Sequence, residues 1–347
     1  MKQSGLVFDC ALFLLLSVPL TTNNQAAETQ QGDLDQSGII DAADQVILSN
    51  YLAGNLDSIP AQFGQFYEYN PIVKILRLVP GGTFTQGSPP DEPCRMEMEA
   101  QFTHTLTLAM SVMETEVTRQ MWADLRAVQP TLPADPTDAA HGAGMTNPVQ
   151  SVTWYEAVLY ANLLAAQQGL TRCYYTDAGF TTPVTASNYT TGPFYCDFNA
   201  NGYRLPTEGE WEYFCRAGAT TPFWIPEPNY NSGNCAACTS GLLPNLESAA
   251  VFCANNPGGT AAVATKEANP WGLYDTHGNV WEWCWDWFGD YPSGSATDYR
   301  GAAAGSRRMN HGGGWNTGPN GCRSDHRGNY YPDGRLDHLG FRLVRSL

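Results

Sequence analysis

The chain has 347 residues and a formal net charge of −16, an acidity that argues against nucleic acids and anionic membrane surfaces as partners. Hydrophobic residues make up 43% of the sequence, which is ample for a core, and the length accommodates two domains or one large domain with appendages. Only 15% of the residues are charged, while 34 Gly and 23 Pro favour loops and turns over long helices.

The N-terminus has the pattern of a secretory signal peptide over residues 1–27. Lys2 precedes the apolar run ALFLLLSVPL at 11–20, and a polar stretch then ends in Ala26-Ala27. The apolar run is too short to span a bilayer, and no later segment of the sequence is apolar enough to do so. We therefore expect an exported protein, secreted or held in the periplasm or at the cell surface, with no membrane span.

An acidic loop with the spacing of a calcium site lies within 32–56. In DLDQSGIIDAAD, side-chain oxygens fall at positions 1, 3, 5, 9 and 12, a glycine makes the turn at position 6, and position 7 offers its carbonyl. The predicted calcium ligands are Asp33, Asp35, Ser37, Ile39, Asp41 and Asp44. This EF-hand-like loop and the short helix after it resemble one dockerin repeat, and no second repeat follows. Two interpretations stay open: a half-module that docks a protein partner or dimerises, and a calcium-ordered stalk without a partner.

Residues 57–72 are predicted to be a linker, and the main domain is expected over 73–347. The domain opens with a strand at 75–79 that turns at Pro80-Gly81-Gly82. The alternating segment HTLTLA, at 104–109, is predicted to be the partner of that strand.

Three helices are expected in the main domain. A short one is predicted near 118–125. The clearest covers 154–168, because Thr153 and Glu156 form a capping box before an apolar face. A second capping box, Thr207 with Glu210, begins a helix over 208–216. Loops rich in Gly, Asn and Pro occupy most of the rest, so we expect an α+β fold with little regular secondary structure.

Alternating tryptophans mark one further strand. Trp281, Trp283, Trp285 and Trp287 alternate with Glu282, Cys284 and Asp286, which predicts a strand with one apolar face turned to the core. A tight turn precedes it and carries Asp275. A loop with two carboxylates and free carbonyls suits calcium, although two carboxylates that simply cap the turn would have the same spacing.

Nine of the ten cysteines lie beyond the signal peptide, which predicts disulfides in an exported, loop-rich chain. The stretch from Cys173 to Cys196 is predicted to form a hairpin closed by a disulfide between these two residues. For Cys235 and Cys238 we expect a local disulfide, with a redox or zinc pair as the alternative. The odd number leaves at least one thiol free or intermolecular.

Several motifs resemble those of the formylglycine-generating enzyme, or sulfatase-modifying factor, family. They are PGGTFTQGS at 80–88, PVQSVTWYEAVLYANLLA at 148–165, RLPTEGEWEYFCRAG at 204–218, GLYDTHGNVWEWCWDW at 272–287 and HLGFRLV at 338–344. The similarity runs in the family's order from about Val73 to the C-terminus. It implies the family's C-type-lectin-like fold for the main domain.

The resemblance implies an oxidase in which two thiolates hold Cu(I) and molecular oxygen converts a cysteine of a client sulfatase to formylglycine. Cu(I) prefers soft thiolate ligands. In HGGGWNTGPNGCRSDHR, at 311–327, the positions that match the two cysteines are Thr317 and Cys322, and Trp281 matches an active-site tryptophan. A threonine hydroxyl is a hard, protonated group that replaces a thiolate poorly. We therefore expect no copper centre, and a binding or scaffold domain that lacks the oxidase.

Two alternatives remain: an active formylglycine-generating oxidase, and a divergent metal oxidase that uses Cys322. His326 and His338 could complete a mixed nitrogen–sulfur metal site with Cys322. The simpler interpretation gives Cys322 a disulfide partner and leaves both imidazoles in solvent. A peptide, a sulfatase and a glycan all stay open as ligands.

The resemblance also implies a calcium ion in the turn before the tryptophan strand. Its expected ligands are the side chains of Asp275 and Glu282 and the carbonyls of Gly278 and Val280. A second calcium site of the family would fall within 229–262, where we assign no ligands.

Overall fold

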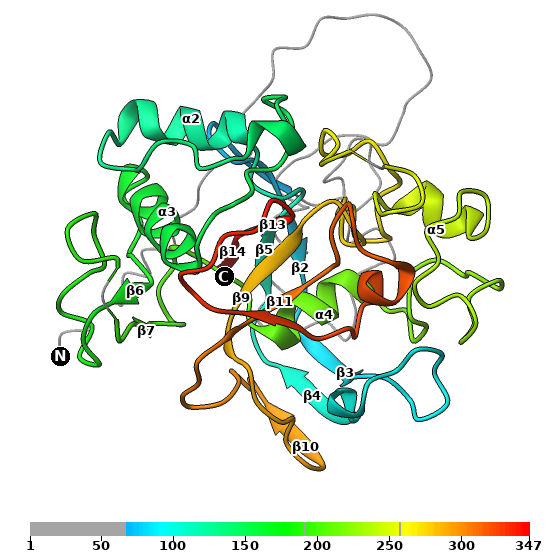
Figure 1. Ribbon diagram of the computed structural model, residues 1–347. Helices are drawn as coiled ribbons and strands as arrows, with labels where there is room; N and C mark the ends of the chain where they lie inside the picture. The colour runs from blue at the N-terminus through cyan, green and yellow to red at the C-terminus, as the bar shows by residue number, and fades with distance from the viewer. Residues whose placement is uncertain (1–66, 191, 257) are drawn as a thin grey trace, which may run out of the picture. The chain divides into compact units, whose positions relative to one another are not determined.

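The computed structural model describes residues 67–347 except 191 and 257 (Figure 1). The predicted signal peptide, the dockerin-like loop and the linker up to residue 66 lie outside the described residues and stay predictions. The described part mixes helices with short strands, as an α+β fold requires. The helices are α2 (Arg119–Val128), α3 (Trp154–Gln167), α4 (Glu208–Arg216) and α5 (Pro244–Ala249), with 3-10 turns η2 (Glu97–Glu99), η3 (Ala139–His141) and η4 (Pro319–Cys322).

The described strands form four small sheets. The first has the order β1 (Tyr67–Asn70), β2 (Lys74–Val79), β5 (Met110–Met113), β14 (Val344–Ser346), β8 (Tyr203–Arg204). The second has the order β10 (Ser295–Thr297), β4 (Phe102–Leu106), β3 (Gly82–Gln86). The third has the order β12 (Gly328–Tyr330), β11 (Arg308–His311), β9 (Trp281–Trp287), β13 (Leu339–Gly340). The fourth is the hairpin of β6 (Tyr174–Tyr175) and β7 (Tyr195–Cys196).

The predicted first strand is confirmed as β2, but its predicted partner was wrong. The segment around His104 forms β4, which pairs with β3, and β2 pairs instead with β1 and β5. The turn at Pro80-Gly81 carries the chain from the first sheet to the second. Strand β3 therefore lies between the two predicted strands along the chain and takes β4 as its antiparallel neighbour.

The three predicted helices are confirmed as α2, α3 and α4, and both capping boxes form. The Glu156 amide donates to the Thr153 hydroxyl (3.1 Å), while the Glu156 carboxylate accepts from the Thr153 amide (2.9 Å). Thr207 and Glu210 repeat this exchange at the start of α4. Helix α3 is buried along most of its length and carries the main hydrophobic core. None of the helices within 67–347, residues 191 and 257 aside, is long and apolar enough to cross a bilayer.

The tryptophan strand is confirmed as β9, but the expectation of a single buried face was wrong. Glu282, Cys284 and Asp286 on the opposite face are fully buried, whereas of the tryptophans only Trp283 is. The reason is that both faces of β9 pack into hydrophobic clusters, with Trp283 in one cluster and Cys284 in another. The buried carboxylates find specific partners; Asp286, for example, accepts from the Glu208 amide (2.8 Å) at the start of α4.

Among the residues that the structure describes, two disulfides form, and neither matches a predicted pair. Cys94 bonds to Cys235, and Cys238 bonds to Cys253, so each half of the CxxC pair joins a different segment of the chain. The predicted Cys173–Cys196 bond is also absent: the hairpin is confirmed, but both residues are free thiols. Cys196 pairs in register with Tyr174, so Cys173 and Cys196 project from opposite faces of the hairpin.

Candidate functional site

The segment that matches the family's reactive centre leaves β11 through a glycine turn and returns through η4 to β12. Gly312 and Gly313 have positive φ angles of 97° and 79°, which other residues rarely adopt. The turn places Thr317 beside Trp281, the first residue of β9. The Thr317 hydroxyl accepts from the Trp281 indole N–H (3.2 Å) and from the Gly314 amide (3.0 Å). Trp281, one of the two predicted catalytic residues, therefore contacts Thr317 directly.

Cys322 is a free thiol, and the expectation of a disulfide partner was wrong. Its side chain is fully buried in an apolar cluster with Phe223, Leu243 and Phe252. Burial raises the pKa of the Cys322 thiol far above its ordinary value, and the nearby Cys215 thiol adds to this rise. At neutral pH the Cys322 sulfur is therefore protonated and sealed from solvent.

Cys215 and His277 come close to Cys322 from two other segments. The Cys215 thiol, in α4, donates to the Thr276 carbonyl (3.4 Å), and burial raises its pKa to about 12. His277 donates from Nδ1 to the Cys322 carbonyl (2.7 Å) and accepts at Nε2 from the Trp224 amide (3.3 Å). Burial lowers the pKa of His277 to about 3. These bonds use both ring nitrogens of a neutral imidazole, so His277 holds the backbone in place.

The predicted nitrogen–sulfur set of Cys322, His326 and His338 does not assemble. Among the described residues, one group of three His, Cys, Asp or Glu side chains has all its ligand atoms within 4.8 Å, and it contains none of these three. Burial, followed by the charge of Arg323, lowers the pKa of His326 to about 3, and its ring packs near Trp281 (5.5 Å between centroids). His338 lies at the surface with Nδ1 2.6 Å from Asp337.

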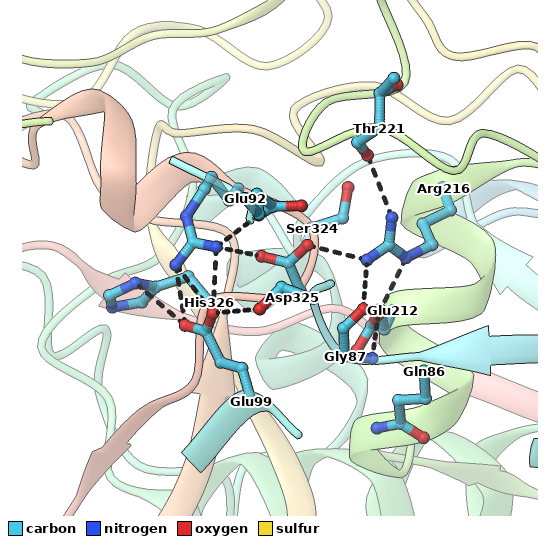
Figure 2. Close-up of polar contacts among 12 residues, drawn as sticks. Gln86, Gly87, Glu92, Glu99, Glu212, Arg216, Thr221, Ser324, Asp325 and His326 are labelled. Carbon is cyan, nitrogen blue, oxygen red and sulfur yellow. Dashed lines mark hydrogen bonds and ion pairs between the residues drawn. The ribbon is translucent and has the colours of Figure 1, made fainter. Parts of the chain in front are cut away.

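A buried network of ion pairs includes the residues that directly follow Cys322 in the chain (Figure 2). The Asp325 carboxylate lies between two guanidinium groups, at 2.6 Å from Arg323 and 2.8 Å from Arg216. Arg323 also donates to Glu92 (2.5 Å) and Glu99 (2.8 Å). This arrangement fixes the backbone next to Cys322, because its neighbour Arg323 is held by three carboxylates.

The network contains more carboxylates than guanidinium groups. Arg216 also pairs with Glu212 (2.8 Å), so two arginines face four buried acids. Burial, with the nearby Asp325 charge, raises the pKa of Glu92 to about 8. Burial likewise raises the pKa of Glu212 to about 7. One oxygen of each of these two carboxylates has no hydrogen-bond partner within the described chain.

The turn at which calcium is predicted has an unusual backbone conformation. Asp275, Gly278 and Asn279 all have positive φ angles (57°, 88° and 58°). Asp275 accepts from the Ala264 amide through Oδ2 (2.7 Å), whereas its Oδ1 is buried and has no partner among the residues described. Both oxygens of Glu282 are engaged, by the Arg342 guanidinium (2.6 and 2.7 Å) and by the Trp211 indole (2.8 Å).

Glu116, which the sequence analysis did not single out, lies near this turn. It is fully buried, its Oε1 has no partner in the described part of the chain, and its Oε2 accepts from Asn279 at 3.4 Å. Burial raises the pKa of Glu116 strongly, and the charge of Asp275 adds to the rise. Burial also raises the pKa of Asp275 to about 6. Two unpartnered buried carboxylate oxygens are a fit environment for a hard cation. No local signal marks Glu116, because only the fold brings it to the turn.

Solved structures with the same mixed helix and sheet fold define the class of this domain. Treponema denticola variable protein 1 aligns with a TM-score of 0.66 and 28% identity, over 81% of this chain and 99% of that one. PvdO from Pseudomonas aeruginosa aligns with a TM-score of 0.60 and 24% identity, over 81% of this chain and 98% of that one. Both structures have a fold of the formylglycine-generating enzyme type, with mixed helices and sheets.

The family follows from the sequence match. The sulfatase-modifying factor enzyme 1-like domain covers residues 71–347, and the chain belongs to this family. A chaperone protein LppX from Paenibacillus barcinonensis is 30% identical over 67% of this chain and 78% of its own length. A formylglycine-generating enzyme from Streptomyces coelicolor is 34% identical over 42% of this chain, and one from Mus musculus is 32% identical over 47%. The chain spans less than half the length of these two enzymes, 47% and 44%.

Proposed function

We propose that this chain is an exported binding or scaffold protein, stabilised by calcium, that retains the sulfatase-modifying factor frame without the copper oxidase centre. The observation that carries the proposal is the pair of positions 317 and 322. Thr317 presents a hydroxyl that is already hydrogen-bonded to Trp281, and Cys322 presents a buried, protonated thiol. This donor set does not fit Cu(I), which needs two accessible thiolates.

The relatives support a binding role. One relative at 30% identity is named a chaperone, and the match covers most of its length, whereas the matches to the formylglycine-generating enzymes cover less than half of theirs. A protein that binds a polypeptide client without oxidising it would keep the surface around Trp281 and lose the second thiol. The candidate ligands are a peptide, a sulfatase and a glycan. The disulfides Cys94–Cys235 and Cys238–Cys253 favour an oxidising compartment outside the cytosol.

The experiment that tests the proposal incubates the full chain with Cu(I), oxygen and a CxPxR client peptide. We expect no aldehyde by mass spectrometry, while an active formylglycine-generating enzyme treated in parallel converts the same peptide. Fluorescence anisotropy of the labelled peptide, against a scrambled one, separates binding from turnover. Formation of formylglycine by the wild-type chain would overturn the proposal.

A second candidate function, a divergent copper oxidase, rests on the Cys215 thiol beside Cys322. Cys215 comes from a different segment and is near enough for its charge to act on Cys322. Against this candidate, both thiols are fully buried and both have raised pKa values, so neither supplies a thiolate at neutral pH. Cu(I) titrations of Cys215→Ser and Cys322→Ser distinguish the two functions. Tight binding in the wild-type chain, lost in both variants together with peptide oxidation, would favour the oxidase.

We also propose a structural calcium ion at the turn that carries Asp275. Asp275 would contribute its carboxylate, Gly278 and Val280 their carbonyls, and Glu282 its carboxylate, as the family resemblance implies. Glu282 could bind the ion only while it shares its oxygens with Arg342, so we add Glu116 as the more available acid. Calcium would stabilise the turn by neutralising charge that is otherwise buried without a partner. The predicted loop from Asp33 to Asp44 would hold a second ion and could dock a protein partner.

A further inference from the structure

Three metal-ligating side chains meet at the surface, outside the sites described above. Asp138 precedes the short turn η3, His141 ends that turn, and Asp337 comes from the segment before β13. His141 Nδ1 lies 3.1 Å from Asp138 Oδ2 and 3.2 Å from Asp337 Oδ2. All three ligand atoms lie within 4.8 Å of one another. Each side chain is partly open to solvent, with exposed fractions of 48%, 35% and 29%.

The distances between these atoms match the distances between neighbouring ligand atoms around a bound metal ion. Imidazole nitrogen and carboxylate oxygen bind zinc at about 2.0–2.2 Å. Ligand atoms around such an ion are about 3.0 Å apart in an octahedron and about 3.4 Å apart in a tetrahedron, by the geometry of those bond lengths. The two nitrogen–oxygen separations, 3.1 and 3.2 Å, lie between these values.

Hydrogen bonding satisfies this arrangement less well than a cation would. A ring nitrogen carries at most one proton, and here two carboxylate oxygens face the same nitrogen at nearly equal distances. One of the two oxygens must share the proton or face the nitrogen without one. A divalent ion would bind all three atoms at once and would offset the repulsion between the two carboxylates.

Buried neighbours hold the backbone of both aspartates and the ring of the histidine in place before any ion binds. Gln150, which is fully buried, accepts from the Asp138 amide (3.2 Å) and donates to the Asp138 carbonyl (2.7 Å). Trp315 stacks on the His141 ring (5.3 Å between centroids, 17° between planes) and donates to the Asp337 carbonyl (3.1 Å). Such outer contacts orient ligands in established metal sites.

We propose that Asp138, His141 and Asp337 form a binding site for a first-row divalent cation such as Zn²⁺ or Mn²⁺. A set of one nitrogen and two oxygens suits these ions, and it excludes Cu(I), which needs soft ligands. Water or an anionic group of a bound ligand would fill the remaining coordination positions. Trp315, which stacks on His141, precedes Thr317 by two residues, so the site is linked to the segment that contacts Trp281. The site would form whether or not the chain is an oxidase.

The test measures Zn²⁺ affinity of the full chain by competition with a chromophoric chelator, in excess Ca²⁺ to saturate oxygen-only sites. We expect one Zn²⁺ per chain, and about a 100-fold loss of affinity in His141→Ala and in Asp337→Asn, since loss of a supporting residue alone costs 10–100-fold. Asp91→Asn is the matched control, because Asp91 is an exposed acid away from the cluster. Mn²⁺ titrations followed by electron paramagnetic resonance repeat the measurement without thiol binding. Cys196→Ser tests, for Zn²⁺, the one free cysteine of the described residues that is not classed as fully buried.

Circular dichroism and the melting temperature in metal-free buffer establish that each variant is folded. Unchanged affinity in both His141→Ala and Asp337→Asn would overturn the proposal, as would an equal loss in Asp91→Asn. Loss of binding in Cys196→Ser alone would assign the ion to that thiol and would equally overturn it.

Discussion

The indole N–H of Trp281 donates to the hydroxyl of Thr317 across 3.2 Å, at the position that the family resemblance matches to a cysteine. The same hydroxyl accepts from the Gly314 amide, so Thr317 closes the glycine turn as well as contacting the tryptophan. The threonine therefore supports the conformation of the segment through two hydrogen bonds.

Replacing Thr317 by valine keeps the shape of the side chain but removes both hydrogen bonds. We expect Thr317→Val to lower the free energy of unfolding by about 1–3 kcal/mol, because two donors lose their acceptor. Thr317→Ser is the matched control and should retain most of the stability, since it keeps the hydroxyl. Urea denaturation measures both. Equal stability of the valine and serine variants would contradict the structural role of the hydroxyl.

Arg323 should be among the least replaceable residues of the described chain. Arg323→Met leaves Glu92, Glu99 and Asp325 buried around an apolar side chain, and breaking a buried ion pair in this way costs about 3–5 kcal/mol. Arg345→Met is the control: Arg345 pairs with Glu68 nearer the surface, and loss of such a pair costs about 0–1 kcal/mol. Urea denaturation of the two variants should differ by several kcal/mol in the free energy of unfolding; comparable losses would contradict the network as drawn.

The same network predicts a pH dependence with a definite sign. Burial raises the pKa of Glu92 from 4.5 to about 8 and that of Glu212 from 4.5 to about 7. Between pH 4.5 and 8 these two carboxyls therefore bind more protons in the folded state than in the unfolded state, and their contribution to stability falls as the pH rises through this window. The buried His277 and His326, with pKa values lowered to about 3, oppose this trend below about pH 6.5, so thermal melts from pH 7 to 9 in chelator should show the decline. Glu92→Gln should flatten it, whereas Glu97→Gln, an exposed acid in the same loop, should leave it unchanged.

Local sequence signals predicted the helices well and the long-range pairings poorly. The capping boxes at Thr153 and Thr207 act within one turn, so they predicted α3 and α4 directly. The alternation of tryptophans predicted β9, but which face is more buried depends on what the fold packs against it, and the more completely buried face is the one with Glu282. Disulfide pairing and the approach of Glu116 to Asp275 depend on segments far apart in the sequence. The identity of position 317 was readable from the motif, whereas the burial of Cys322 required the fold.

Glu116 gives the sharpest test of the proposed calcium ion, because its substitution should change the stability of the protein in opposite directions with and without the ion. In chelator, Glu116→Gln should be as stable as the wild-type chain or more stable, since it removes a buried carboxyl that lacks a partner for one oxygen. In millimolar Ca²⁺, the wild-type chain should melt at a higher temperature, whereas the variant should gain little.

Glu282→Gln is the contrasting variant: it weakens the bidentate pair with Arg342 and should destabilise the protein in both buffers. Asp33→Asn, in the predicted N-terminal loop, should lower the number of bound ions without removing the calcium-dependent gain that depends on Glu116. Scanning calorimetry with atomic absorption of the dialysed protein measures both quantities, and a calcium-dependent gain that persists in Glu116→Gln would place the ion elsewhere.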